Sequence, residues 1–206
     1  MKSIIKTKNL SYKDFLHYPD MTIEKNNVTF ISGESGCGKS TLLKLFNGTI
    51  SPSEGSIFYN EKNISSINKV NLRREVLLVK QVPFLFGGSI YENFEKFHEI
   101  HETKCPSREE IDNFLKLCCI PKPLDTICEK MSGGERQRLF LSIAISLAPK
   151  VLLLDEPTSA LNKELSNELM NSIINFSKQH DISLVVVSHD MDLQSTFAEK
   201  VIEIKK

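Results

Sequence analysis

Residues 33–41 read Gly-Glu-Ser-Gly-Cys-Gly-Lys-Ser-Thr and match the phosphate-binding loop pattern G-x-x-x-x-G-K-[ST]. An apolar run at 28–31 predicts a strand before this loop, and residues 41–46 predict a helix after it. Glycines allow successive backbone N–H groups to point at a phosphate chain, and the helix start adds partial positive charge. The residues expected to hold a nucleotide are Gly33, Glu34, Ser35, Gly36, Cys37, Gly38, Lys39, Ser40 and Thr41.

Within this loop, Lys39 is expected to reach the terminal phosphates, and the Ser40 hydroxyl is expected to ligate Mg²⁺. The flanking strand and helix are the context that the motif requires, which makes a chance glycine-rich turn a poor explanation. The loop leaves the activity open, because kinases, GTPases and transport ATPases all use it. Cys37 is expected to serve as a small residue inside the loop, with a redox role as the weaker alternative.

Length and charge narrow the class of protein. A chain of 206 residues suits one α/β domain with a small inserted subdomain. Lysine plus arginine and aspartate plus glutamate are 26 each, so the formal net charge is zero, which argues against a dominant nucleic-acid surface. The 5 cysteines form no C-x-x-C pair and no zinc spacing, as expected in a reducing cytosol.

No segment of the sequence is expected to enter a bilayer. Residues 1–8 alternate as a strand does and lack the apolar segment of a signal peptide. The longest apolar runs, around 151–154 and 184–187, are far too short to span a membrane. Any task at a membrane would therefore require a partner chain.

The order of the elements predicts an α/β fold with a parallel sheet. Strands are expected at 3–10, on either side of a turn at Asn26-Asn27 within 21–31, and at 55–59, 75–80, 151–156, 183–187 and 201–204. Residues 84–130 carry short helical patterns at 89–97 and 107–118 and indicate an inserted helical subdomain. A helix over 132–147 begins at Ser132, with Glu135 placed as its capping-box partner, and another helix covers 162–178.

Polar residues follow three of the expected strands. Asp155 and Glu156 end one apolar run, His189 follows the next, and Gln81 follows the strand at 75–80. A parallel sheet would bring these residues and the phosphate loop into one crevice. Asp155 can then hold Mg²⁺, Glu156 can polarise an attacking water, and His189 can contact the γ-phosphate or orient that water. Each residue alone has an ordinary structural explanation, and their combination makes that explanation improbable.

With these motifs, the chain resembles the ATP-binding cassette (ABC) ATPases over essentially its whole length. Residues 33–41 resemble the Walker A motif, and residues 131–138 (Met-Ser-Gly-Gly-Glu-Arg-Gln-Arg) resemble the signature motif. Residues 151–157 resemble Walker B with its catalytic glutamate, and residues 159–162 resemble the D-loop. The resemblance implies a RecA-like P-loop NTPase core, an N-terminal antiparallel β subdomain, and a helical subdomain at about 84–130 joined by the signature helix 132–147, all within a single domain 1–206.

The resemblance also implies roles for individual residues. Glu156, His189, Gln81 and Lys39 would be catalytic, and Ser40, Gln81 and Asp155 would hold Mg²⁺ beside ATP. Tyr12 would stack on adenine, with Phe15 or Tyr18 as alternatives. The signature residues expected to bind a phosphate across a dimer are Ser132, Gly133, Gly134 and Glu135.

A partner arrangement follows from the same resemblance. Two cassettes would pair head to tail as a homodimer with two active sites, and each ATP would lie between the loop of one subunit and the signature of the other. Residues near Gln81 and the helical subdomain would transmit the motion to a separate membrane permease. The protein is then expected in the cytoplasm, peripheral at the inner face of the cell membrane, without nucleic acid.

Three positions depart from the pattern: Asn162 replaces the usual D-loop aspartate, Glu135 a frequent glutamine, and Met131 a leucine. The loss of charge at Asn162 could alter communication between the sites. A non-transport cassette acting on nucleic acid, or on a ribosomal or repair complex, is the alternative function. A small-molecule P-loop kinase would leave residues 132–138 unexplained. The direction of transport and the cargo stay open.

Overall fold

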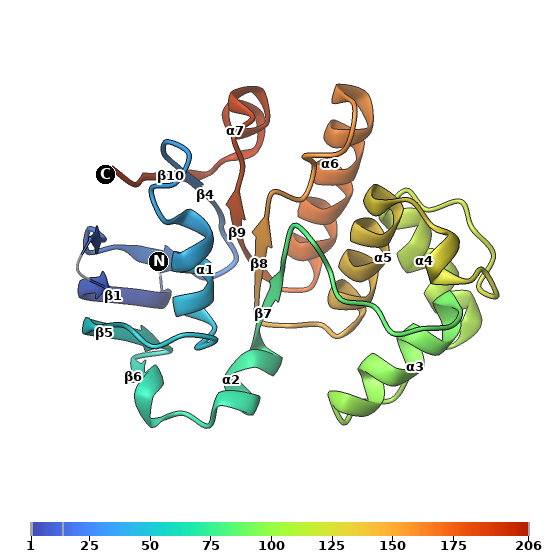
Figure 1. The fold of residues 1–206 in the computed structure, drawn as a ribbon, viewed down its shortest axis with the longest axis horizontal. Helices are drawn as coiled ribbons and strands as arrows, with labels where there is room; N and C mark the ends of the chain where they lie inside the picture. The colour runs from blue at the N-terminus through green and yellow to red at the C-terminus, as the bar shows by residue number, and fades with distance from the viewer. Residues whose placement is uncertain (1, 14, 206) are drawn as a thin grey trace.

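A computed structural model describes residues 2–13 and 15–205. Two sheets divide the molecule, and in Figure 1 the antiparallel sheet lies to one side of the parallel sheet, with helices α3 to α5 at the opposite end. The antiparallel sheet has the order β2-β1-β5-β6, with β3 also paired to β1. Its strands are β1 (Ser3–Tyr12), β2 (Leu16–His17), β3 (Thr22–Glu24), β5 (Glu54–Tyr59) and β6 (Lys62–Asn63).

The parallel sheet positions the candidate site. Its order is β10-β4-β9-β8-β7, with β10 (Lys200–Glu203), β4 (Val28–Ser32), β9 (Ser183–Val187), β8 (Val151–Asp155) and β7 (Val76–Val79). All four neighbouring pairs are parallel, so the carboxyl ends of the strands meet at one edge. The central strands β8 and β9 are almost wholly buried, which accounts for their continuous apolar sequences.

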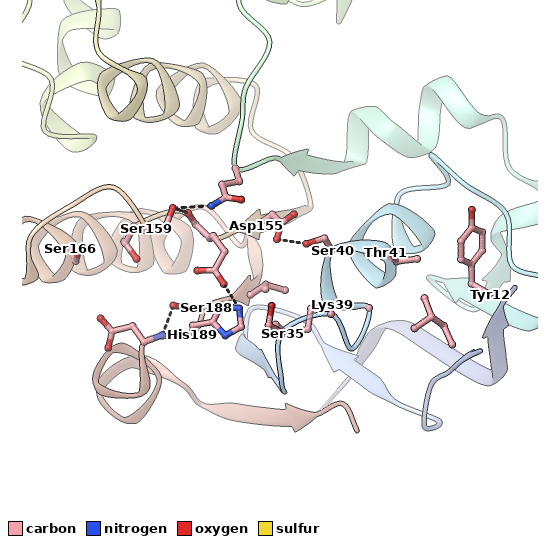
Figure 2. A pocket seen from close by; sticks show the side chains of 18 of the residues that line it. Tyr12, Ser35, Lys39, Ser40, Thr41, Asp155, Ser159, Ser166, Ser188 and His189 are labelled. Atoms are coloured by element: carbon pink, nitrogen blue, oxygen red, sulfur yellow. Dashed lines mark hydrogen bonds and ion pairs between the residues drawn. The ribbon is translucent and has the colours of Figure 1, made fainter. Parts of the chain in front are cut away.

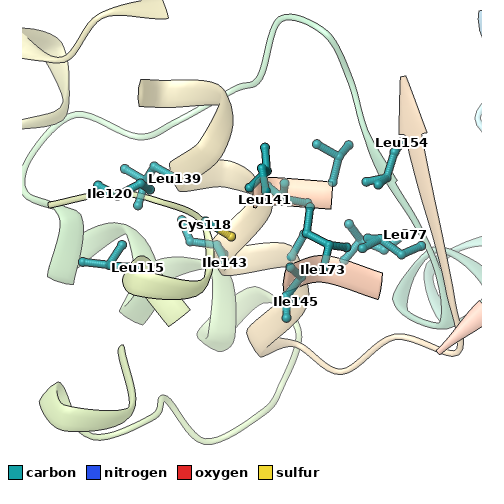
Figure 3. Packing of buried hydrophobic residues seen from close by; sticks show 14 of the residues in the cluster. Leu77, Leu115, Cys118, Ile120, Leu139, Leu141, Ile143, Ile145, Leu154 and Ile173 are labelled. Carbon is teal, nitrogen blue, oxygen red and sulfur yellow. The ribbon is translucent and has the colours of Figure 1, made fainter. Parts of the chain in front are cut away.

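Successive residues of these strands enter two different hydrophobic cores, as the alternation of side chains along a strand requires. Leu152 and Leu154 of β8 face the core shared with helices α5 and α6, whereas Val151 and Leu153 face the core shared with α1 and the antiparallel sheet. Figure 3 shows the first of these cores, where residues of α5 and α6 pack toward Leu77 and Leu154 of the sheet. The sheet is therefore covered on both faces.

Seven α-helices complete the described part of the chain. They are α1 (Lys39–Phe46), α2 (Lys69–Glu75), α3 (Ile90–Ile100), α4 (Arg108–Leu117), α5 (Gly133–Ser146), α6 (Lys163–Gln179) and α7 (Met191–Phe197), with single 3₁₀ turns at Ile64–Ser66 and Cys128–Lys130. Ser89, Ser107 and Ser132 each cap a helix through a complete capping box. None of the described helices is long and apolar enough to cross a bilayer.

The α/β class with a parallel sheet and an additional antiparallel sheet is confirmed. The turn expected at Asn26-Asn27 is confirmed as well, because it separates β3 from β4 and Asn26 has φ 55°. Some other local expectations need correction. The helix after the phosphate loop begins at Lys39 rather than at residue 41, because Gly38 already occupies its N-cap. Helix α2 and the short strands β2 and β6 were not expected from the sequence.

Candidate nucleotide-binding site

The phosphate loop connects β4 to α1, and its shape depends on two glycines. Gly33 has φ 148° and Gly38 has φ 95°, a region that residues with a side chain rarely adopt. A Cβ on Gly33 would collide with the carbonyl oxygen of Ile204, and one on Gly38 would lie 2.7 Å from the Tyr18 hydroxyl oxygen. The loop is therefore packed against Ile204, which follows β10 (Lys200–Glu203), on one side and against Tyr18 on the other.

The loop lies beside an open cleft of about 810 Å³ at the carboxyl edge of the parallel sheet. Of the expected nucleotide-binding residues, Gly33, Glu34 and Cys37 belong to the loop without lining the cleft, and Cys37 is buried. The cleft-lining residues include Tyr12, Ser35, Gly36, Gly38, Lys39, Ser40, Thr41, Gln81, Asp155, Glu156, Ser159 and His189. The structure thus brings together residues from five separate segments of the sequence that were expected to share a site.

Lys39 is the first residue of α1, and its ammonium group turns back over the loop. Its Nζ donates hydrogen bonds to the carbonyl oxygens of Gly33 at 2.7 Å and Glu34 at 2.9 Å. The side chain is 6% exposed, so these carbonyls compensate its burial. A phosphate group entering the cleft would offer the ammonium a charged acceptor in exchange.

Ser40 and Asp155 face each other across the base of the cleft (Figure 2). The Ser40 hydroxyl donates to Asp155 Oδ1 at 2.9 Å, which joins the start of α1 to the end of β8. A hydroxyl and a carboxylate at this separation form an oxygen donor set of the kind that Mg²⁺ prefers. Gln81, the third expected ligand, also lines the cleft and supplies an amide oxygen.

Glu156 stands beside His189, with 3.3 Å between Glu156 Oε1 and His189 Nε2. Burial raises the pKa of the Glu156 carboxyl, and the charge of Asp155 adds to this, while His189 and Lys39 act in the opposite direction. Glu156 Oε1 has no hydrogen bond of good geometry within the described structure, so the contact with His189 is an ion-pair approach only. A half-buried carboxylate with spare acceptor capacity could accept a proton from a water molecule.

Gln81 reaches the same region from the end of β7. Its Nε2 donates to the Ser159 hydroxyl at 3.4 Å, and that hydroxyl donates to the carbonyl oxygen of Glu156 at 3.2 Å. The side chain of Gln81 is therefore connected through Ser159 to the backbone of Glu156.

The aromatic residues proposed for base stacking lie in different environments. Tyr12 and Phe15 line the cleft, and Figure 2 shows Tyr12 at the far side of it from His189. Phe15 is 70% exposed, whereas Tyr18 is 6% exposed and does not line the cleft. The Tyr18 hydroxyl donates to the Gly38 carbonyl at 3.0 Å, so its place is beneath the loop rather than against a base. Burial raises the pKa of this phenol.

The segment Ser132–Glu135 forms a separate surface at the start of α5. Ser132 Oγ accepts the N–H of Glu135 at 3.3 Å, and Glu135 Oε2 accepts the N–H of Ser132 at 2.8 Å. The hydrogen bond from the Ser132 N–H, followed by the adjacent Lys122, lowers the pKa of the Glu135 carboxyl. None of the four residues from 132 to 135 belongs to the described lining of the cleft, although Gly134 lies near Ala160 of the loop after β8.

Two residues hold the site in place in ways that sequence reasoning did not anticipate. Tyr18, named from the sequence only as an alternative for base stacking, supports the phosphate loop. Gln137 of α5 is 4% exposed, and its Nε2 donates to the carbonyl oxygen of Glu156 at 3.0 Å. No sequence signal singled out Gln137, because Glu135, Arg136 and Arg138 beside it are polar as well, and nothing in the sequence identifies its partner.

A parallel sheet with a glycine-rich loop at a helix start, a serine–aspartate pair and a half-buried carboxylate beside it defines a P-loop nucleotide hydrolase. This is the class of protein that fold and site describe together.

Comparison with known proteins identifies the family within this class. Residues 16–159 match the family described as ABC transporter. The phosphate import ATP-binding protein PstB of Borrelia garinii subsp. bavariensis is 36% identical, with 96% of this chain and 82% of that protein covered. The probable iron export ATP-binding protein FetA of Escherichia coli (strain K12) is 32% identical over 98% and 91% of the two chains.

A solved structure agrees with the sequence relatives. The structure of cbiO1 from Clostridium perfringens, part of the ABC transporter complex cbiONQ, superimposes with a TM-score of 0.84 at 30% identity, covering 100% of this chain and 86% of that one. The chain belongs to the ABC transporter family, and it is an ATPase, the ATP-binding and hydrolysing subunit of a transporter. These comparisons support the transport function and not the nucleic-acid alternative.

Proposed function

We propose that this subunit works as a homodimer that closes on two ATP molecules and thereby drives a separate membrane permease. The proposal rests on the observation that the cleft contains only one part of the expected site. The cleft holds the phosphate loop, Asp155, Glu156 and His189, whereas the capped helix start at Ser132 lies outside its lining. A second copy, placed head to tail, would offer Ser132 and the free N–H groups of that helix start to the phosphates.

The residues in the cleft then have distinct tasks. Lys39 and the loop N–H groups bind the phosphates, and Tyr12 stacks on adenine. Ser40, Asp155 and Gln81 hold Mg²⁺, which would neutralise phosphate charge when bound. Glu156 accepts the proton of the attacking water, and His189 orients that water or contacts the γ-phosphate. We assign Gly33, Glu34 and Cys37 to the shape of the loop.

A permease partner is supported by exposed apolar residues next to Gln81. Val82 is 81% exposed and Phe84 is 65% exposed. A neighbouring cavity of about 160 Å³ lies between β7, α3 and α5 and is lined mainly by apolar side chains, among them Leu77, Phe97 and Phe140. Apolar residues gathered at a surface are typical of a protein interface. We place the protein at the cytoplasmic face of the membrane, bound to the permease, as one domain with a helical subdomain at about 84–130 plus 132–147, and without nucleic acid.

Substitution of Glu156 by glutamine tests the closed dimer. Glu156→Gln keeps the shape of the site and removes the group that accepts the proton, so ATP and Mg²⁺ should bind without turnover. The variant should then elute as a dimer on size-exclusion chromatography with ATP and as a monomer without it. Lys39→Ala, which loses the phosphate-binding ammonium, is the control and should stay monomeric in both conditions. A Glu156→Gln variant that hydrolyses ATP as the wild type does would refute the role of Glu156.

A further inference from the structure

Glu156 has a backbone conformation that needs outside support. Its φ is 52°, in the left-handed region that residues with a side chain rarely adopt. Pro157 follows it, and a proline pushes the preceding residue toward extended backbone. Such a conformation persists only where the surrounding structure fixes it, and such sites are concentrated in active centres.

Hydrogen bonds at both ends of the residue supply this support. The N–H of Glu156 donates to the carbonyl of Val187 at 3.0 Å, which continues the pairing of β8 with β9. The carbonyl oxygen of Glu156 accepts Gln137 Nε2 at 3.0 Å, Ser159 Oγ at 3.2 Å and the Ser159 N–H at 3.4 Å. The bond from Gln137 is the shortest of the three. It also comes from a distant part of the chain, whereas Ser159 belongs to the same turn as Glu156.

The donor itself is held firmly. Gln137 is 4% exposed, so water does not readily replace its hydrogen bond. The following turns of α5 are anchored by Leu139, Leu141 and Ile143, which are at most 1% exposed and pack into the core shown in Figure 3. A donor on a rigid helix can fix the position of the oxygen that it contacts.

We propose that Gln137 is a positioning residue for ATP hydrolysis, which holds the backbone of Glu156 so that its carboxyl faces the cleft. With the N–H and the carbonyl both fixed, the direction of the Cα–Cβ bond of Glu156 is fixed as well. Ser132 caps the start of the same helix, so the place of Glu156 depends on where this helix lies. The inference rests on the proposed role of Glu156 as the proton acceptor.

The test compares three substitutions in the full-length chain with ATP and Mg²⁺. Gln137→Met has a similar length and cannot donate, and Gln137→His retains an N–H donor at a similar reach. Gln179→Met makes the matched change at an exposed position at the end of α6 and should leave turnover unchanged. The unfolding midpoint of each variant is measured alongside its activity.

For Gln137→Met we expect kcat to fall about ten-fold while KM for ATP changes less than about two-fold, because the contact aligns a reacting group and does not touch the nucleotide. Gln137→His should recover part of this loss.

Two results would overturn the inference. One is a Gln137→Met enzyme with the kcat of the wild type. The other is a crystal structure of that variant in which the φ of Glu156 and the place of its carboxyl are unchanged. Glu156→Gln is assayed in parallel to separate this inference from the proposed function. If Glu156→Gln still turns over, the role of Glu156 fails; if it is inactive while Gln137→Met is fully active, only the positioning role fails.

Discussion

Asn93 of α3 is fully buried, and its replacement by leucine tests how the segment after Gln81 is held in place. The side chain of Asn93 bonds to the backbone of Phe86 and Ser89. Its Oδ1 accepts the N–H of Phe86 at 2.9 Å, and its Nδ2 donates to the carbonyls of Phe86 at 3.2 Å and Ser89 at 2.9 Å. Cys128 Sγ lies 3.3 Å from the same nitrogen. One amide thus organises the turn that leads into α3.

The magnitude follows from these contacts. Asn93→Leu removes three hydrogen bonds to backbone groups, each worth about 1 kcal/mol, so the free energy of unfolding should fall by about 3 kcal/mol. Leucine has the same branched arrangement of side-chain heavy atoms as asparagine and is larger, so the substitution leaves no cavity. The Phe86 N–H and carbonyl are left without their partner, and this prevents the apolar side chain from compensating the loss.

Urea unfolding followed by circular dichroism measures the difference in unfolding free energy. Asn175→Leu is the matched control, because Asn175 is exposed on α6 and bonds only to Asn171 at 3.4 Å in the described structure. That variant should change stability by less than about 0.5 kcal/mol. A loss below about 1 kcal/mol in Asn93→Leu, after the control is subtracted, would show that the amide does not hold the turn.

Two further predictions concern the cleft. Without nucleotide, Glu156→Gln should be more stable than the wild type near neutral pH, since the raised pKa means that the folded state favours the uncharged carboxyl; this advantage should vanish below about pH 4, where the wild-type group is also protonated. Thermal unfolding of both proteins between neutral pH and about pH 4 tests this prediction. A stability difference that grows as the pH falls would contradict it. Tyr18→Phe, which removes the donor to the Gly38 carbonyl, should weaken ATP binding about five-fold by calorimetry, and unchanged affinity would show that the loop does not need that bond.

The parts of the site that could be predicted from sequence are those with local patterns. The phosphate loop has a fixed spacing. Asp155 ends β8 and Glu156 follows it, while Gln81 and His189 each lie two residues after the end of β7 and β9. Once the sheet is parallel, such positions must meet at one edge, so their proximity needs no knowledge of side-chain packing. The capping boxes of α3 and α5 are equally local, because both partners lie within one turn.

The parts that could not be predicted depend on contacts between distant residues. Tyr18 supports Gly38, and Gln137 supports Glu156, but neither pair has a spacing that a sequence pattern would reveal. Helix α2 escaped prediction for a different reason. It has seven residues, of which Leu72 is the buried one, so its apolar periodicity is too short to detect. Its Asn68 cap is visible only once the helix is known.

Asn162 stands where a D-loop usually has aspartate, and this difference affects helix capping and charge in different ways. Its Oδ1 accepts the N–H of Leu165 at 2.9 Å and caps the start of α6. Aspartate and asparagine are about equally good in this position, so the amide keeps the helix start that a D-loop aspartate would provide. What changes is the charge, because a carboxylate would add a negative group next to Leu161 and Lys163 at the mouth of the cleft. Any functional difference between the wild type and an Asn162→Asp variant should therefore depend on ionic strength. The stability of α6 should be the same in the two proteins.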